Sequence, residues 1–182
     1  MSLMVISKLF DDEVLLSSEV SLKKFSSLSA DESFFISASI ARNFYRDSFL
    51  DFGVTSVAKT KKYFSSAELD PDRVFFIAYF KGISIAHIGV KKISDCWLLL
   101  DNALRISPSG PKDTIKLMID YFYTVIRRSE FFKTVVVINR SNKSILRHYA
   151  NYDFDTFSEP IYEKYGLSKE SFIFAELRQK FE

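Results

Sequence analysis

At 182 residues the sequence is long enough for one domain with a core of two or three layers. A hydrophobic fraction of 47% and an aromatic fraction of 16% exclude an intrinsically disordered chain. The formal charge of +2 excludes the dense positive surface that sequence-independent nucleic-acid binding requires, so we expect no nucleic-acid partner.

The N-terminal part of the chain, residues 4–72, is predicted to be helical. Apolar side chains recur at intervals of three and four over residues 34–48 and again over residues 54–66, which is typical of amphipathic helices. The second helix is predicted to end before the turn signal Asp-Pro-Asp at residues 70–72.

From residue 73 onward the pattern becomes that of β-strands. Two apolar runs, residues 73–80 and 83–90, are separated by Lys81 and Gly82, which predicts a tight hairpin. A third strand is predicted over residues 96–106. The remaining elements are predicted to be a helix, a buried strand, a second helix and an antiparallel pair of closing strands, over residues 111–128, 133–138, 142–150, 154–157 and 171–177.

Cysteine and histidine are too few to form a disulfide or a typical metal site. Cys96 is the only cysteine, and the apolar residues beside it suit a buried side chain. His87 and His148 lie far apart, so no metal is expected. No apolar run reaches the ~20 residues that span a bilayer, and no signal-peptide pattern is present, so we expect a cytoplasmic protein without a membrane partner.

Two segments resemble the GNAT superfamily of N-acetyltransferases, and together the resemblance covers residues 73–178. In one, a strand ending at Asn139 leads into a helix that carries Asn142, Tyr149 and Phe154 at the family's spacing, with Asp153 where the family usually has glycine. In the other, residues 104–108 and the helix that follows resemble the family's strand, phosphate loop and helix.

The phosphate loop has one glycine and two fewer positions than the family pattern. The resemblance places the cofactor's pyrophosphate at Ser109, Gly110, Lys112, Asp113 and Thr114. The last three lie where a helix begins, and free N–H groups and the helix dipole attract phosphate there. A plain helix cap without a ligand accounts for the same residues, so both interpretations stay open.

The resemblance implies direct transfer of an acyl group from acetyl-CoA to a small primary amine, such as an amino sugar. The pantetheine arm would pair with the amides of Leu104 and Ile106 like an added strand, next to Asn142. Tyr149 would return a proton to the departing thiolate.

The general base and the oxyanion donor are less defined. Asp101 is the first candidate for the base and His87 is the second. His87 shares a sheet face with Ile83 and Ile85, which favours a structural histidine of the sheet over a base. Asp101 and Asn102 interrupt an apolar strand, and a bulge there would free an N–H for the oxyanion.

The implied fold is α/β, with a mixed, mostly antiparallel central sheet flanked by helices on both faces. We take residues 4–182 as a single domain, with residues 4–72 on the acceptor side and residues 73–182 forming the hairpin, the acyl-CoA core and the closing strands. Residues 1–3 resemble an added expression prefix.

Two alternatives and the oligomeric state stay open. The chain could be a GNAT-shaped binding or interaction protein without turnover, or an unrelated α/β scaffold, and a homodimer is compatible with either. The strands that end near Ile106 and Ile138 distinguish the GNAT arrangement from an unrelated scaffold. In the GNAT arrangement the two strands diverge, whereas strands that stay paired to their ends would rule it out.

Overall fold

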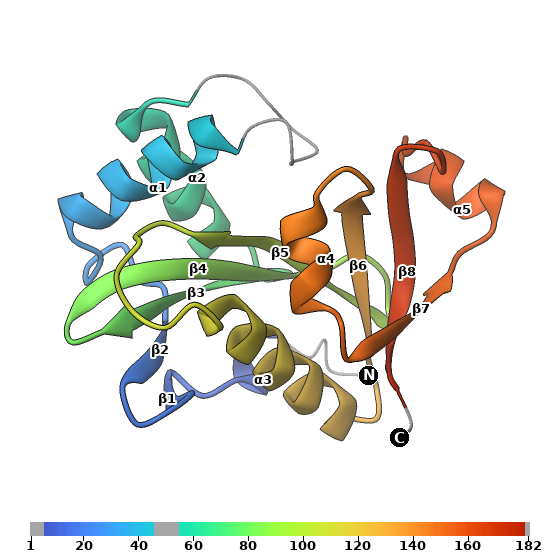
Figure 1. The fold of residues 1–182 in the computed structure, drawn as a ribbon, viewed down its shortest axis with the longest axis horizontal. Coiled ribbons are helices and arrows are strands. Elements are labelled where there is room, and N and C mark those ends of the chain that lie inside the picture. Colours follow the sequence, from blue (N-terminus) through green and yellow to red (C-terminus); the bar gives the residue numbers. More distant parts are fainter. Residues whose placement is uncertain (1–5, 46–54, 181–182) are drawn as a thin grey trace.

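The structure is a computed structural model that describes residues 6–45 and 55–180 (Figure 1). Its strands are β1 Glu13–Leu15, β2 Val20–Lys24, β3 Arg73–Phe80, β4 Ile83–Lys92, β5 Trp97–Arg105, β6 Lys133–Asn139, β7 Tyr152–Thr156 and β8 Phe172–Gln179. Its helices are α1 Glu32–Phe44, α2 Val57–Glu68, α3 Thr114–Arg128, α4 Lys143–His148 and α5 Glu159–Lys164, with a 3-10 turn, η1, at Ile6–Leu9.

The eight strands form one sheet in the order β1-β2-β3-β4-β5-β6-β8-β7. Every neighbouring pair is antiparallel except β5 and β6, which are parallel. The prediction of a mixed, mostly antiparallel sheet is therefore confirmed.

The helical prediction for residues 4–72 is wrong before residue 25, because β1 and β2 lie there and extend the sheet beyond β3. β2 is only five residues long, and its buried apolar side chains are just Val20 and Leu22. Two alternating apolar residues are too short a signal to separate a strand from a loop.

The two predicted helices and the hairpin are confirmed. α1 and α2 are preceded by the N-caps Asp31 and Ser56, whose side chains accept a hydrogen bond from the N–H three residues on. Residues 46–48 and 54, at the predicted helix ends, lie outside the described residues. In the hairpin, Lys81 and Gly82 both have positive φ, 51° and 79°, as a type I′ turn requires.

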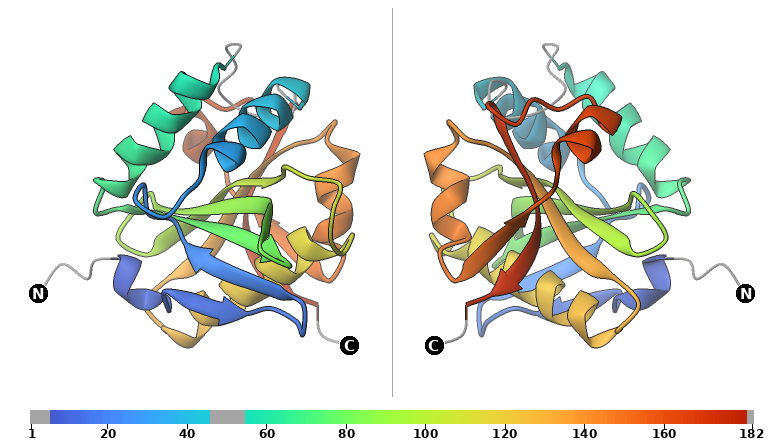
Figure 2. Two further views of the ribbon diagram at one scale, coloured as in Figure 1. Left: turned by 90° about the vertical axis from the view of Figure 1, so that its left-hand side faces the viewer. Right: turned by 90° about the vertical axis from the view of Figure 1, so that its right-hand side faces the viewer.

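Helices cover both faces of the sheet (Figures 1 and 2). α3 packs on one face over a cluster of aliphatic and Phe side chains that includes Met118, Ile119 and Phe122. α1 and α2 pack on the other face over a cluster rich in phenylalanine, including Phe34 and Phe64. α5 contributes Tyr162 to a third, smaller cluster with Val135 and Phe174.

Candidate active site

The parallel strands β5 and β6 stay paired for only part of their length. The ladder joins Trp97–Leu100 of β5 to Lys133–Val136 of β6 and then stops, although β5 continues to Arg105 and β6 to Asn139. β6 turns instead toward β8, with which it pairs as far as Asn139. The two strands therefore diverge, and α4 lies beside the gap between them (Figure 1).

A groove runs along this divergence. Its deep part is a pocket of about 70 Å³, lined by Leu100, Asn102, Ala103, Val137, Ile138, Asn139, Asn142, Ile145 and Tyr149. Its outer part is a hollow of about 380 Å³, lined by Tyr45, Ala103, Leu104, Arg105, Lys112, Ile115, Asn142, Ser144, Ile145, Arg147 and His148. Ala103, Asn142 and Ile145 border both parts, so the pocket and the hollow form one groove.

The outer hollow is positively charged. Arg105, Lys112 and Arg147 line it, and its lining contains no Asp or Glu. Burial lowers the pKa of His148, and the nearby Arg105 and Arg147 lower it further. A hollow of this sign attracts an anion such as a pyrophosphate.

Arg105 fills the loop that precedes α3. Its guanidinium donates to five backbone carbonyls at distances of 2.9–3.1 Å, those of Ser107, Pro108, Ser109, Gly110 and Pro111. The loop thus turns its carbonyls inward to a cation. Neither Ser109 nor Gly110, both predicted to contact the cofactor, lines the groove, and their contact with the cofactor stays a prediction.

The first turn of α3 offers free amides instead. The helix begins at Thr114 rather than at Pro111, because the N–H and hydroxyl of Thr114 both donate to the Pro111 carbonyl. Among the described residues, no acceptor faces the N–H groups of Lys112, Asp113, Ile115 and Lys116. The side chain of Asp113 makes no capping bond, and that of Thr114 is buried, so Lys112 is the predicted loop residue whose side chain reaches the groove.

Tyr149 lies at the deep end of the groove. It follows the last residue of α4, its side chain is 3% exposed, and its ring packs against Tyr152 and Phe154. Burial raises the pKa of its hydroxyl well above the ordinary value, so the hydroxyl keeps its proton at neutral pH. The cap of α4 is Asn142, whose side-chain oxygen accepts from the N–H of Ile145 at 3.1 Å.

The predicted bulge in β5 is present. Gly89 pairs with Asp101 and His87 with Leu104, so one residue of β4 lies opposite two residues of β5, Asn102 and Ala103. Asn102 has a φ of 53°, in the left-handed region that asparagine tolerates.

The bulge changes which amides face the groove. The N–H of Ile106 donates to the Ile85 carbonyl of β4 at 2.9 Å, and Ile106 is buried, so this N–H already has a partner and its pairing with pantetheine stays a prediction. Successive amides of a strand face opposite sides, so we infer that the N–H of Leu104 also faces β4. The N–H groups of Ala103 and Arg105 then face the opening, while the side chain of Leu104 borders it.

Neither candidate base lines the groove. Asp101 forms an ion pair with Arg73 on the α2 side of the sheet. His87 is fully buried against Phe34 and Phe64. Neither ring nitrogen meets the geometry of a hydrogen bond among the described residues, although the backbone of Asn102 lies near enough to offset part of the fall in its pKa. Burial lowers the pKa of His87 to about 3, with a smaller contribution from Arg42, so the ring is neutral at physiological pH.

Sequence reasoning missed Arg105 and Arg147. Neither was named as a candidate site residue, whereas both line the groove. The signal for Arg105 was its position, because a single cation near the end of an apolar strand and just before a Pro-Gly loop is placed to bind the carbonyls of that loop.

Comparisons with solved structures identify the architecture. The microcin C7 self-immunity acetyltransferase MccE, solved with acetyl-CoA and AMP, superposes with a TM-score of 0.69 over 97% of this chain and 99% of its own, at 10% identity. The chain has the GNAT fold. The ribosomal L7/L12 alpha-N-protein acetyltransferase RimL matches with a TM-score of 0.68 over 92% of this chain and 94% of its own, at 12% identity.

A third GNAT-fold structure was solved with coenzyme A. The PaiA N-acetyltransferase from Thermoplasma acidophilum matches with a TM-score of 0.59 over 88% of this chain and 99% of its own, at 11% identity. No family model matches the sequence, and no curated protein matches it significantly. At these identities the likeness establishes the fold, and the chemistry rests on the groove itself.

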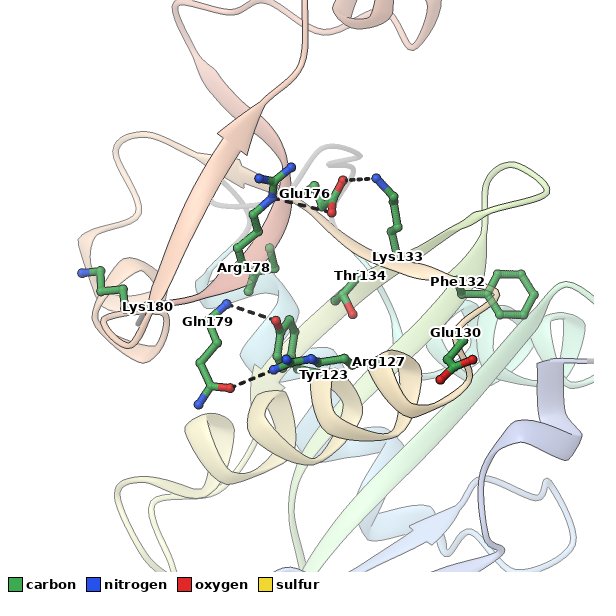
Figure 3. Close-up of a pocket in the computed structure, with 11 residues that line it drawn as sticks. Tyr123, Arg127, Glu130, Phe132, Lys133, Thr134, Glu176, Arg178, Gln179 and Lys180 are labelled. Atoms are coloured by element: carbon green, nitrogen blue, oxygen red, sulfur yellow. Dashed lines mark hydrogen bonds and ion pairs between the residues drawn. The ribbon is translucent and has the colours of Figure 1, made fainter. Parts of the chain in front are cut away.

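Other parts of the described surface carry weaker signals. A hollow of about 450 Å³ at the C-terminal end of α3 holds Arg127, Lys133 and Arg178, but Lys133 and Arg178 lie within 4 Å of the Glu176 carboxylate (Figure 3). Among residues 6–45 and 55–180, no helix has the length and apolarity to cross a membrane. The same residues contain no cluster of three or more potential His, Cys, Asp or Glu metal ligands.

Proposed function

We propose that this protein is an N-acyltransferase that uses acetyl-CoA, or a similar acyl-CoA, to acylate a small primary amine. One observation carries the proposal: β5 and β6 diverge after four paired residues and open a groove whose outer end is basic and whose deep end holds Tyr149. An elongated ligand with an anionic head and a neutral amide-containing arm fits such a groove.

The residues of the groove fit this ligand in three parts. Lys112, Arg147 and the free amides at the start of α3 would hold the pyrophosphate. The outward amides of Ala103 and Arg105 would pair with the amides of the pantetheine arm. The acyl group would then lie in the deep pocket, between Asn102 and Tyr149.

The proposed reaction is a direct transfer. The amine nitrogen bonds to the thioester carbonyl carbon, the carbon–sulfur bond breaks, the nitrogen loses one proton and the thiolate gains one, giving an N-acyl amine and free CoA. Tyr149, which is neutral and buried, would hydrogen-bond to the sulfur and supply its proton. Because neither Asp101 nor His87 lines the groove, we assign removal of the amine proton to solvent water.

A second candidate function rests on the same loop. Arg105 occupies its interior, and no carboxylate lines either part of the groove, so a protein that binds acyl-CoA or another anion without turnover is the alternative. The two functions share the binding step and differ in chemistry.

Calorimetry of acetyl-CoA and CoA with the purified protein tests the binding step. We expect micromolar affinity for the wild type and a loss of about tenfold or more in Lys112→Glu, because the substitution reverses charge beside the pyrophosphate. Lys8→Glu makes the same charge change at an exposed site outside the groove and should bind like the wild type.

Turnover separates the two functions. Amines, beginning with amino sugars, would be screened for release of free thiol by wild type and Tyr149→Phe. Acylation that is reduced in Tyr149→Phe at unchanged acetyl-CoA affinity supports the enzyme. Tight binding without acylation of any amine supports the binding protein. No binding at millimolar acetyl-CoA rejects the enzyme and leaves only a protein that binds another anion.

A further inference from the structure

We propose that Tyr63 of α2 is a positioning residue, whose hydroxyl holds the β5 bulge in the shape that points an N–H at the bound acyl group. This inference rests on the proposed function of the groove. It assigns a positioning role in that function to a residue outside the groove, on α2.

The Tyr63 hydroxyl lies at the junction of a closed ring of interactions. It accepts a hydrogen bond from Arg73 at 2.6 Å and another from the side-chain amide of Asn102 at 2.8 Å. Arg73 in turn forms an ion pair with Asp101. Because Asp101 directly precedes the bulge residue Asn102, these interactions fasten both side chains to α2 and β3.

A second helix holds the other end of the Asn102 side chain. The guanidinium of Arg42, from α1, donates to the Asn102 side-chain oxygen at 3.4 Å and lies 4.5 Å from the centre of the Tyr63 ring. Asn102 is thus bonded at both its oxygen and its nitrogen. A side chain held in this way stabilises the left-handed backbone of Asn102, which would otherwise be disfavoured.

The backbone that is held leads directly into the groove. Asn102 and Ala103 both line the deep pocket with Tyr149. The peptide between them carries the N–H of Ala103, which by strand alternation faces the opening. A donor fixed there stabilises the charge that develops on an acyl oxygen, and a shift of about 1 Å can lower the rate about a hundredfold.

The hydroxyl of Tyr63 is not needed for packing. Tyr63 packs against Phe64 and Phe75 in a cluster in which a phenylalanine would fit equally well. Burial, and secondarily Asp101, raise the pKa of Tyr63 to about 12, so the hydroxyl stays neutral at physiological pH. What the hydroxyl adds is its two hydrogen bonds, and these converge on the bulge.

The test compares Tyr63→Phe with Tyr79→Phe, which removes a hydroxyl from the same side of the sheet without touching the bulge. Each variant and the wild type would be mixed with acetyl-CoA labelled with ¹³C at the thioester carbonyl. Calorimetry gives the affinity, infrared difference spectroscopy gives the carbonyl stretch, and free-thiol release gives turnover with water or any amine found.

We expect Tyr63→Phe to bind acetyl-CoA within about twofold of the wild type, while its carbonyl stretch moves toward that of free acetyl-CoA and its turnover falls tenfold or more. Tyr79→Phe should match the wild type in all three measurements. Arg73→Lys keeps a cation beside Asp101 but shortens the reach to Tyr63, and it should resemble Tyr63→Phe.

A carbonyl stretch and turnover in Tyr63→Phe equal to those of the wild type would overturn this inference alone. A large loss of acetyl-CoA affinity in Tyr63→Phe would also overturn it, because the damage would then extend beyond the bulge. Failure of the wild type to bind acetyl-CoA would remove the proposed function, and this inference with it.

Discussion

The two faces of the sheet bury different types of side chain. The face under α3 is closed by aliphatic and aromatic side chains such as Ile119 and Phe122, and its cluster contains no buried charged side chain. The face under α1 and α2 is rich in phenylalanine, yet it also buries His87 and borders the ion pair of Arg73 with Asp101.

This difference separates the side chains that stabilise the fold from those that we connect with the function of the groove. Burying an unpaired polar group costs free energy, so an optimally stable fold would avoid it. The face under α1 and α2 retains such groups beside the bulge that lines the groove. We infer that the α3 face mainly supplies stability and that the α1–α2 face gives up some stability for function.

The largest expected effect is on the α3 face. Phe122→Ala removes a fully buried ring that contacts Phe10 and Phe76, and should lower the free energy of unfolding by ~3–5 kcal/mol in urea denaturation. Phe131→Ala, at a ring that is 73% exposed, should change it by less than ~0.5 kcal/mol. Similar losses in both variants would contradict the assignment of this core.

The next effect is a dependence on pH from the other face. The folded pKa of His87 is about 3, below its unfolded value of 6.5, so the unfolded state binds the proton more tightly. His87 therefore contributes stability above pH 6.5 that is lost as the pH falls toward 3, about 3 kcal/mol by pH 4.

Replacing His87 isolates that dependence. His87→Leu should flatten the curve of unfolding free energy against pH between 7 and 4, measured by urea titration at each pH. The control is His148→Gln, at the half-buried histidine of the outer hollow, which should keep most of the slope. Parallel curves for wild type and His87→Leu would show that His87 is not buried as described.

A smaller effect is expected at the loop that Arg105 fills. Gly110 has a φ of 80°, and a Cβ there would lie 2.9 Å from the Cδ1 of Ile85. Gly110→Ala should lower the free energy of unfolding by ~1–3 kcal/mol. It should also weaken acetyl-CoA binding, because the substitution distorts the loop and the start of α3 together. Gly166→Ala, with a φ of 65° and open space around it, should show only the backbone part of the loss.

The smallest effect is at the start of α4. Asn142→Ala removes the cap of a six-residue helix and should cost ~1 kcal/mol in the free energy of unfolding. Asn142→Asp keeps the accepting oxygen and should stay within a few tenths of a kcal/mol of the wild type. Equal losses in the two variants would mean that the amide nitrogen, rather than the cap, carries the stability.

Sequence patterns predicted the elements that have strong local signals. The run from residue 73 to residue 90, the helix ending at Arg128 and the strand from Lys133 all carry long apolar patterns, and each is found close to its predicted bounds. β1, β2 and α5 were missed because three to six residues cannot establish a period.

The site was predictable where it depends on local chemistry. The bulge at Asp101 and Asn102 showed as a polar break in an apolar strand. Tyr149 and Asn142 were chosen through the resemblance to the GNAT superfamily, and nothing in their own residue types singles them out. The engagement of Asp101 by Arg73 could not be predicted, because the two residues are 28 positions apart. The same holds for the Ile106 amide, whose partner depends on the register after the bulge.

The route of the chain between β2 and β3 has an engineering consequence. These strands are neighbours in the sheet, and the N–H of Phe25 donates to the Phe75 carbonyl at 2.7 Å, so the segment carrying α1 and α2 leaves and returns at one point. Its ends are held by the sheet, and a longer or shorter segment changes the closure entropy only slowly.

The segment is therefore an insertion between two neighbouring strands of the sheet. A designer could exchange residues 26–72 for another helical pair and leave the sheet, α3 and the basic end of the groove in place. Such a chimera would need to retain a partner for Asn102 and Arg73 at the bulge, and apolar side chains that cover this face of the sheet. Under the proposed function, acceptor choice and donor binding could then be varied separately within one chain.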